Sequence, residues 1–141
     1  MIGAPLLAWF GGAQLFLFVY AIPLLLASAL GAYLFYAQHN FVGMQVPSDD
    51  EWEYHDASVA TSSYLETGAL MRFFTGNIGF HHVHHLNAQI PFYRLPQVMA
   101  EFPELQNPVK TTLRPGDVLG CLRLKLWDPA QGRMVGFGDA G

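Results

Sequence analysis

The chain has 141 residues, a length suited to one domain, and a formal net charge of −4 at pH 7. It is 52% hydrophobic and only 13% charged, whereas soluble domains carry about a quarter charged residues. The negative charge argues against a nucleic-acid partner, which requires a basic face. The single cysteine, Cys121, excludes an internal disulfide and a cysteine-rich zinc site.

The first part of the chain is apolar and carries no Asp, Glu, Lys or Arg before Asp49. Within it, residues 13–36 (AQLFLFVYAIPLLLASALGAYLFY) exceed the roughly 20 apolar residues that cross a bilayer as a helix. We therefore predict one spanning helix at Ala13–Tyr36, apolar on every side and tolerant of Pro23. A signal peptide is the competing interpretation, but residues 1–10 lack the basic start that it needs.

The residues before this span predict the end of another helix. Met1–Phe10 is too short to cross a membrane, and Gly11-Gly12 interrupts the apolar run, so a tight hairpin should join the two pieces. The predicted fold class is all-α: a membrane section at residues 1–38, which ends a helical hairpin, and then a cytoplasmic helical region at residues 39–141. The cytoplasmic side follows from the positive-inside rule, because all seven Lys and Arg lie after the span.

Further helices are predicted after the span. The acidic and aromatic stretch at residues 47–56 (PSDDEWEYHD) indicates a loop that enters a helix at the membrane surface. Ser63-x-x-Glu66 fits a capping box, which predicts a helix at Tyr64–Thr75. The sequence TGNIG interrupts this helix, and a second helical stretch should begin near Phe80 and end at Pro91.

Two more segments are predicted towards the C-terminus. Leu95–Glu101 has the pattern of a short amphipathic helix, with Pro96 tolerated in its first turn. Residues 119–129 (LGCLRLKLWDP) alternate apolar and basic side chains. This pattern leaves two interpretations open: a strand, or a segment at the membrane interface with its Leu and Trp side chains towards lipid.

Four of the six histidines lie within five positions of GFHHVHHLN, residues 79–87. On a helix, His81, His84 and His85 stand at i, i+3 and i+4 and share one face, with His82 at its edge. Imidazoles that converge in this way oppose one another's protonation, and a cation relieves the conflict by binding their neutral nitrogens. We therefore predict a metal site. The H-E-x-x-H motif of zinc proteases and the Glu-x-x-His pairs of carboxylate-rich di-iron bundles do not occur here.

The residues around this cluster resemble the third histidine motif of the membrane fatty acid desaturases, especially the bacterial omega-6 (Δ12) enzymes. FTGNIGFHHVHHLNAQIPFYRL, residues 74–95, carries the resemblance. LFYAQHNF, DDEWEYHDASVATSSYLE and LRLKLWDPAQGRMVGF extend it over most of the chain from about Ala13. H-x-x-H-H by itself is shared with alkane hydroxylases and carotenoid-modifying relatives, whereas the longer match is highly specific.

The resemblance implies a set of metal ligands. Matched to the family's motif, four histidines are expected to bind a pair of non-haem irons: His39, His81, His84 and His85. His39 corresponds to an additional histidine that follows the last membrane span of the family. His82 falls at a variable position of the motif and is expected to support the ligands without binding metal. His55 is expected to be a surface or structural residue.

By the same resemblance, the ligand set of this chain is incomplete. Two irons need about eight or more ligands, whereas the chain has six histidines. The family's other two motifs, H-x-x-x-H and a further H-x-x-H-H, lie upstream of this one, and neither occurs before His81. We therefore expect the chain to be the C-terminal portion of a desaturase, inactive by itself.

For the complete enzyme, the resemblance implies O2-dependent formation of a cis double bond in an acyl chain, at Δ12. The expected partners are membrane lipids, a ferredoxin- or cytochrome b5-type electron donor, and a fatty acyl substrate carried as acyl-lipid, acyl-CoA or acyl-carrier protein. The expected location is the bacterial inner membrane, with several spans in the parent enzyme. Two alternatives stay open: an alkane or carotenoid hydroxylase of the same superfamily, and a non-enzymatic, membrane-anchored histidine-rich module that binds metal or senses pH.

Overall fold

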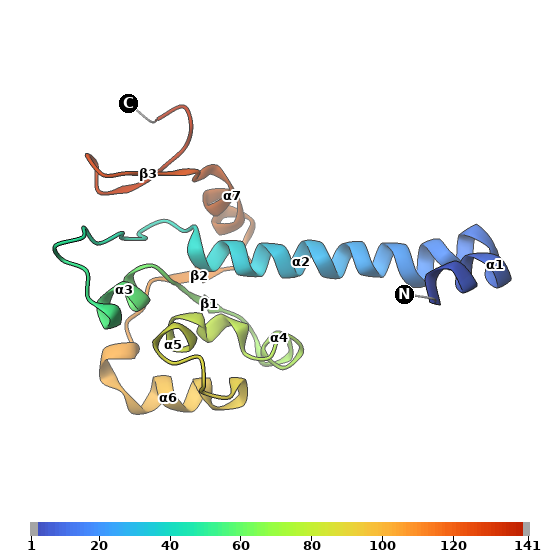
Figure 1. Ribbon diagram of the computed structural model, residues 1–141, viewed down its shortest axis with the longest axis horizontal. Helices are drawn as coiled ribbons and strands as arrows, with labels where there is room; N and C mark the ends of the chain where they lie inside the picture. Colours follow the sequence, from blue (N-terminus) through green and yellow to red (C-terminus); the bar gives the residue numbers. More distant parts are fainter. Residues whose placement is uncertain (1–2, 140–141) are drawn as a thin grey trace. The chain divides into compact units, whose positions relative to one another are not determined.

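The computed structural model describes the backbone of residues 3–139 and, within it, the side chains of residue 5 and residues 9–139. The chain divides into two compact units, Met1–Tyr33 and Leu34–Gly141. The boundary falls inside the long N-terminal helix, so the last turns of that helix belong to the second unit. Figure 1 shows the helices and strands of both units in chain order.

The first unit is helical and is interrupted once, at a glycine. Helix α1 (Gly3–Phe16) departs from helical geometry at Gly12, whose φ of 71° and ψ of 177° suit a residue without a Cβ atom. The predicted interruption at Gly11-Gly12 is therefore confirmed, and the dark-blue segment before it turns back in Figure 1. Met1 and Ile2 of the predicted preceding helix lie outside the described residues.

The backbone beyond this break is helical over the whole predicted span. A π-helical turn, η1 (Leu17–Ala21), leads into α2 (Ile22–His39), and the N–H of Ile22 donates to the carbonyl of Leu17. That bond reaches one residue further back than in an α-helix. Pro23 follows directly; it has no N–H to donate and its ring crowds the preceding turn. The wider turn accommodates the proline without ending the helix.

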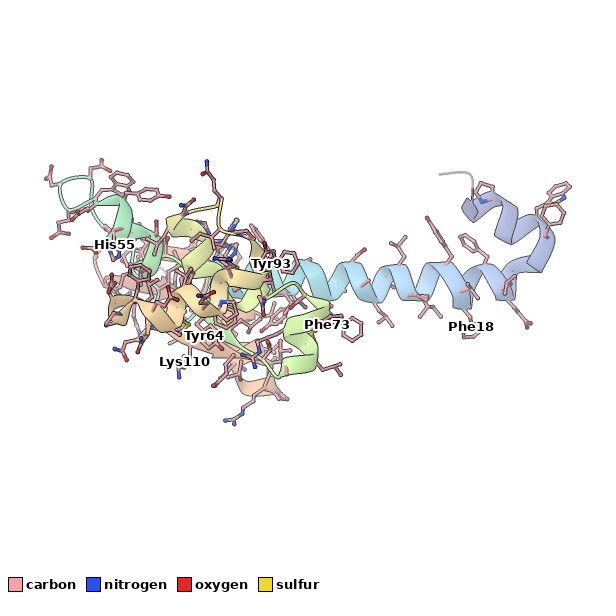
Figure 2. The ribbon with its side chains drawn as sticks, turned by 90° about the horizontal axis from the view of Figure 1, so that it is seen from below. Phe18, His55, Tyr64, Phe73, Tyr93 and Lys110 are labelled. Carbon is pink, nitrogen blue, oxygen red and sulfur yellow. The ribbon has the colours of Figure 1, made fainter. Side chains whose placement is uncertain are left out.

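Within the described residues, one helix, Trp9–His39, is long and apolar enough to cross a membrane. None of its apolar window is buried, in contrast to the core helix of a soluble protein. The side chains of Phe18 and Leu25 are 66% and 68% exposed, and Phe18 points away from the helix in Figure 2. Length, composition and exposure thus agree with the predicted span.

Short elements make up the second unit, which begins with the last turns of α2. In chain order they are α3 (Tyr54–Ala60), β1 (Tyr64–Glu66), α4 (Ala69–Phe74), η2 (Ile78–Phe80), α5 (His81–Leu86), η3 (Phe92–Arg94), α6 (Leu95–Glu101), η4 (Pro103–Leu105), β2 (Lys110–Thr112), α7 (Pro115–Arg123), β3 (Leu126–Asp128) and β4 (Arg133–Val135). The η elements of this unit are single 3₁₀ turns.

The chain is mostly helical, as predicted, but the second unit also contains two small sheets that the all-α prediction did not include. Strands β1 and β2 pair in parallel, and β3 and β4 form an antiparallel hairpin. The helix predicted at Tyr64–Thr75 is wrong in its first part, because these residues begin with strand β1 and α4 starts only at Ala69. The expected capping box does not form. Instead, Ser63 Oγ lies 3.1 Å from Thr111 Oγ1 of β2, so a partner strand distant in sequence overrides the local helix signal.

Other predicted elements are confirmed. Helix α6 occupies Leu95–Glu101 with the proline in its first turn, and α3 follows the acidic loop. Helix α5 lies within the second predicted helical stretch and ends at Leu86. The stretch at residues 119–129 is divided between two elements: its first half belongs to α7, and Leu126–Asp128 forms strand β3, one of the two interpretations of its pattern.

The apolar core of the second unit packs around α5. Phe80, Val83, Leu95 and Leu105 form a buried cluster that joins α5 to α6 and to the turn after α6. Val83 is fully buried. Because Val83 lies about half a helical turn from both His81 and His85, burying its face leaves these two histidines on another side of the helix.

Strand β1 connects the end of α2 to the start of α5. The N–H of Ser63 donates to the carbonyl of Gln38 at 3.0 Å, and Ser63 Oγ donates to the carbonyl of Ala37 at 3.4 Å. On the other side, Gly79 packs so closely against β1 that a Cβ atom at this glycine would lie 2.3 Å from the carbonyl oxygen of Leu65. Strand β1, together with Ser63 directly before it, therefore fixes both histidine-bearing helices.

The TGNIG sequence makes the turn between α4 and α5. Gly76 and Asn77 have φ values of 60° and 56°, in the left-handed region that glycine and asparagine tolerate best. Asn77 Nδ2 also donates to the carbonyl of Phe92 at 3.1 Å, which ties the turn to η3. Together with the close approach at Gly79, this turn sets the start of the histidine helix.

Gly79→Ala should destabilise the second unit, because the added methyl group would meet backbone and not a flexible side chain. We expect the free energy of unfolding to fall by about 2 kcal/mol or more, measured by denaturant unfolding in detergent micelles with circular dichroism. Gly116→Ala is the matched control, since a Cβ atom there has no neighbour within 4 Å and stability should stay equal or rise slightly. Equal stability of the two variants would contradict this packing.

Candidate metal centre

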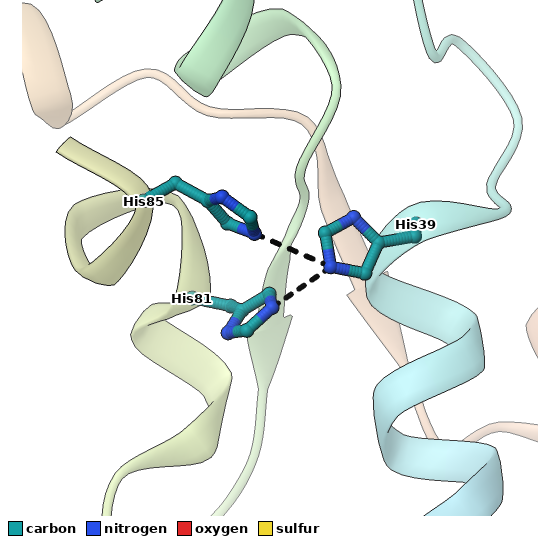
Figure 3. Close-up of side chains that lie close together, drawn as sticks. All are labelled: His39, His81 and His85. Atoms are coloured by element: carbon teal, nitrogen blue, oxygen red, sulfur yellow. Dashed lines mark hydrogen bonds between the residues drawn. The ribbon is translucent and has the colours of Figure 1, made fainter. Parts of the chain in front are cut away.

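Three histidines from two helices converge in the second unit. His39 ends α2, and His81 and His85 stand one turn apart on α5. The Nε2 atom of His39 lies 2.8 Å from Nε2 of His81 and 3.3 Å from Nε2 of His85 (Figure 3). The three potential ligand atoms all lie within 4.8 Å of one another. The three imidazoles thus come from two elements that are far apart in the sequence, the end of α2 and helix α5.

This spacing fits a metal ion. Two nitrogens bound to one metal at about 2.1 Å, and about 90–109° apart, are separated by about 3.0–3.4 Å. The two distances at His39 Nε2 lie close to that range. A neutral imidazole has one donor and one acceptor, so three nitrogens that face one another cannot all be satisfied by sharing protons. A cation satisfies all three.

The tautomer of His39 leaves the lone pair of Nε2 available to bind a metal. Its Nδ1 atom lies 3.4 Å from the backbone carbonyl of Thr61, which can only accept a hydrogen bond. Nδ1–H is therefore the donor, and in a neutral ring the lone pair is then on Nε2. That lone pair is directed towards His81 and His85, where a metal would be held. Hydrogen bonds of this kind orient metal-binding histidines in general.

Burial keeps His81 and His85 neutral. Desolvation, followed by the charges of the neighbouring histidines, lowers the pKa of His81 from 6.5 to about 3. Desolvation, followed by the charges of His39 and His84, also lowers the pKa of His85. Because metals bind the neutral imidazole, His81 and His85 are in their metal-binding form at neutral pH.

His84 lies beside this group and not within it. Its ring stacks on that of His81 with the centroids 5.7 Å apart, and its centroid is 6.3 Å from that of His85. His81 and His84 both line a cavity of about 180 Å³. The other walls of this cavity are Gly76, Ile78, Phe92 and Leu95. Of the four histidines predicted as ligands, the structure thus brings together His39, His81 and His85, with His84 next to them.

The other two histidines lie apart from the group. His82, predicted to support the ligands, is fully buried, with its ring centroid 6.0 Å from that of Tyr64. Within the described residues neither of its ring nitrogens makes a hydrogen bond. Burial lowers the pKa of His82 to about 4, and the nearby backbone of Leu105 acts in the opposite direction. His55 is exposed on α3 (Figure 2), and its Nδ1 lies 3.0 Å from Asp56 Oδ1.

The histidine pattern does not reveal three residues that support the site. Tyr54 O–H donates to the carbonyls of His85 and Leu86, at 2.7 and 3.2 Å, and so caps the end of α5. The ring of Phe35 lies 5.1 Å from that of His39; its i, i+4 spacing from that histidine is a usable sequence signal. Thr61 acts through its backbone carbonyl, which leaves no signal in the sequence.

Comparison with known proteins gives a consistent result. The family model described as Fatty acid desaturase matches residues 1–114. A curated protein of Bacillus subtilis (strain 168), named Fatty acid desaturase, is 36% identical over 126 residues, which are 89% of this chain and 35% of that protein. The chain therefore spans about a third of the length of the curated relative that it matches. No solved structure matches it.

A group of imidazoles at the end of an exposed apolar helix is suited to a metal-binding protein of the membrane. Since the family model covers most of the sequence, the chain belongs to the fatty acid desaturase family. Desaturases of this family generally use iron, and the group formed by His39, His81 and His85 fits a metal ion. The resemblance drawn from the histidine motif is confirmed at the level of the family.

Metal titration tests the group of three histidines. We expect His39→Ala, His81→Ala and His85→Ala each to weaken Co²⁺ binding by the detergent-solubilised chain about tenfold or more, followed through the absorption of bound Co²⁺. His84→Ala should change this affinity by less than about threefold, because its ring lies outside the group. His55→Ala is the matched control for loss of an exposed imidazole. Weakening by His55→Ala equal to that by His81→Ala would contradict the assignment.

Acid should destabilise the metal-free chain through His81 and His82. Their folded-state pKa values, about 3 and about 4, lie below the ordinary value of 6.5. Between these values the unfolded chain binds more protons than the folded one, so the free energy of unfolding falls as pH drops from 6.5 towards 4. His82→Phe should make this fall shallower in denaturant titrations, whereas the slope between pH 7.5 and 8.5 should not change. An unchanged slope below pH 6.5 would refute the role of His82.

Proposed function

We propose that the chain carries part of the non-haem di-iron centre of a membrane fatty acid desaturase, which introduces a cis double bond into an acyl chain with O2 and a reduced electron carrier. The observation that carries the proposal is the convergence of His39, at the end of an apolar helix, with His81 and His85 of the histidine motif. Membership of the desaturase family supports the same reaction class.

His39, His81 and His85 would hold one iron, and His84 would contribute to the second. The cavity that His84 shares with His81 supports this division of the ligands. Two irons require about eight or more ligands, so we propose that the remaining ligands come from segments that this chain does not contain. The chain by itself would then bind metal weakly and lack desaturase activity. When bound, iron supplies the activation of dioxygen and the transfer of single electrons.

The chain's own residues prepare the site for that chemistry. Burial holds His81 and His85 neutral without an added base. Thr61 fixes the tautomer of His39, and Tyr54 fixes the end of the helix that bears His85. Phe35 places an apolar ring against His39 and His81, with its centroid 5.9 Å from that of His81. This apolar side suits a hydrocarbon substrate and restricts water near the ligands.

The reaction balances with four electrons delivered to dioxygen. Two protons and two electrons leave adjacent carbons of the acyl chain as the double bond forms, and two further electrons and two protons come from the reduced carrier and solvent. Dioxygen becomes two molecules of water. The carrier would be of the ferredoxin or cytochrome b5 type, and the substrate an acyl-lipid, acyl-CoA or acyl-carrier protein. We place the reaction at Δ12 of an oleoyl group, on the resemblance to omega-6 enzymes alone.

The proposed location is the bacterial inner membrane, with the second unit on the cytoplasmic side and several spans in the parent enzyme. The exposed apolar helix Trp9–His39 supports a membrane position. The side follows from the distribution of basic residues, all of which lie between Arg72 and Arg133. His39 ends this helix, so the metal centre would lie at the membrane boundary, within reach of both lipid and a soluble electron carrier.

Product analysis tests the proposed reaction. The chain's sequence, joined to the upstream segments of a close relative, is expressed in a host that accumulates oleate, and the fatty acids are separated by gas chromatography. We expect new dienoic acid, and His84→Ala should abolish it, although the same change barely affects the first metal in the isolated chain. New monoenes would move the reaction to Δ9. Hydroxylated alkanes or carotenoids, or full activity of His84→Ala, would overturn the proposal.

A further inference from the structure

Helix α7 has one buried face and one exposed apolar face. Cys121 is 3% exposed and Val118 is half-buried, and these two residues lie one turn apart. On the other side, Leu119 is 54% exposed and Leu122 is 45% exposed. The helix therefore presents two large leucines, at i and i+3, about half of whose surface is exposed in the described chain. Leu126, just after the helix, is 41% exposed as well.

Tyr36 of α2 and Asn40, the residue directly after α2, hold the C-terminal end of α7. Asn40 Nδ2 donates to the carbonyls of Cys121 and Leu124 at 2.7 and 2.9 Å. Tyr36 O–H donates to the same two carbonyls at 3.3 and 3.0 Å. These carbonyls belong to the last turn of α7, where no intrahelical donor remains. The end of α7 is thus fixed at the last turns of α2, as the brown ribbon beside α2 in Figure 1 shows.

Tyr36 lies in the last turn of the candidate membrane span, Trp9–His39, and Asn40 follows it directly. If this end of α2 lies at the membrane boundary, α7 therefore lies at that boundary too. These contacts all lie within the second unit.

Basic side chains follow the exposed leucines. Arg123 is exposed at the end of α7, and Lys125 Nζ lies 5.7 Å from the centre of the Tyr36 ring. In the part of the chain that the structure describes, neither side chain forms a salt bridge with a carboxylate. Leucines on one side with Arg and Lys at the border are the composition of segments that lie in a membrane interface.

We propose that α7, with the residues up to Leu126, lies in the interfacial layer of the membrane, with its exposed leucines against acyl chains and Arg123 and Lys125 against the phosphates of anionic lipids. The occupant of this surface is therefore lipid and not another protein segment. The proposal rests on the membrane position given in the proposed function, and it is independent of the desaturase chemistry.

Fluorescence quenching tests the depth of α7. The reporter is a tryptophan introduced by Leu122→Trp. The three native tryptophans are removed by Trp9→Phe, Trp52→Phe and Trp127→Phe, and the full chain is reconstituted into phosphatidylcholine and phosphatidylglycerol vesicles. Part of the phosphatidylcholine is brominated near the headgroup end of its acyl chains. A second chain keeps only Trp52, an exposed loop tryptophan. We expect the reporter to be quenched at least about twice as strongly as Trp52 in that second chain. Circular dichroism checks that each variant is folded.

Charge variants test the contact with anionic lipid. Quenching of the reporter should rise roughly twofold when phosphatidylglycerol is added, and Lys125→Gln with Arg123→Gln should remove this rise. Arg133→Gln, in the hairpin formed by β3 and β4, is the matched control and should keep it.

A chain that retains only Trp9 separates the two possible failures. Trp9 lies in the candidate span and should be quenched if the helix is inserted. If Trp9 is quenched and the Leu122→Trp reporter is not, α7 faces water or protein and this inference is wrong. If Trp9 is not quenched either, the membrane position in the proposed function fails as well.

Discussion

The packing of strand β1 between two helices is the constraint on which the histidine group depends. Ser63 binds the backbone of α2 one residue before His39, and the carbonyl of Leu65 meets Gly79 two residues before His81. Helix α5 has six residues, too few for a helix to be stable without support. Its position therefore comes from β1, from the apolar core on its Val83 side and from the hydrogen bond of Tyr54 at its end.

The choice of imidazoles alone has an electrostatic consequence. Carboxylate ligands would offset the charge of a bound cation, whereas neutral imidazoles leave that charge uncompensated. The protein removes the competing charge instead, because burial disfavours protonation of His81 and His85. At neutral pH, His81 and His85 can thus bind a cation through their neutral rings, although several imidazoles lie close together. Phe35 and Tyr54, both contributed by neighbouring helices, complete this arrangement with apolar contact and helix capping.

Sequence patterns predict those parts of the molecule that depend on local geometry. The apolar length of residues 13–36, the break at Gly12, the helix at Leu95–Glu101 and the shared face of His81 and His85 each follow from spacing along one element. The strand at β1 does not, because its partner is β2, far along the chain, and the capping signal at Ser63 is used for that pairing.

The same distinction applies to the metal group. Helical periodicity groups His84 with His81 and His85, since all three lie on one face of α5. The tertiary fold brings the ring of His39 closer to those of His81 and His85 than the ring of His84 is. The resemblance to a family indicates His39 as a ligand, whereas periodicity cannot relate residues on separate elements. The contribution of Thr61 is a backbone carbonyl and has no sequence signal.

The pairing of β1 with β2 also fixes when the histidine group can form during synthesis of the chain. His39 leaves the ribosome 42 residues before His81, and β1 is complete well before its partner. The backbone that holds both helices has no lateral support until Lys110–Thr112 have emerged. Closing a loop of this length costs entropy before any contact repays it. The histidine group can therefore take its folded arrangement only after Thr112 has left the ribosome.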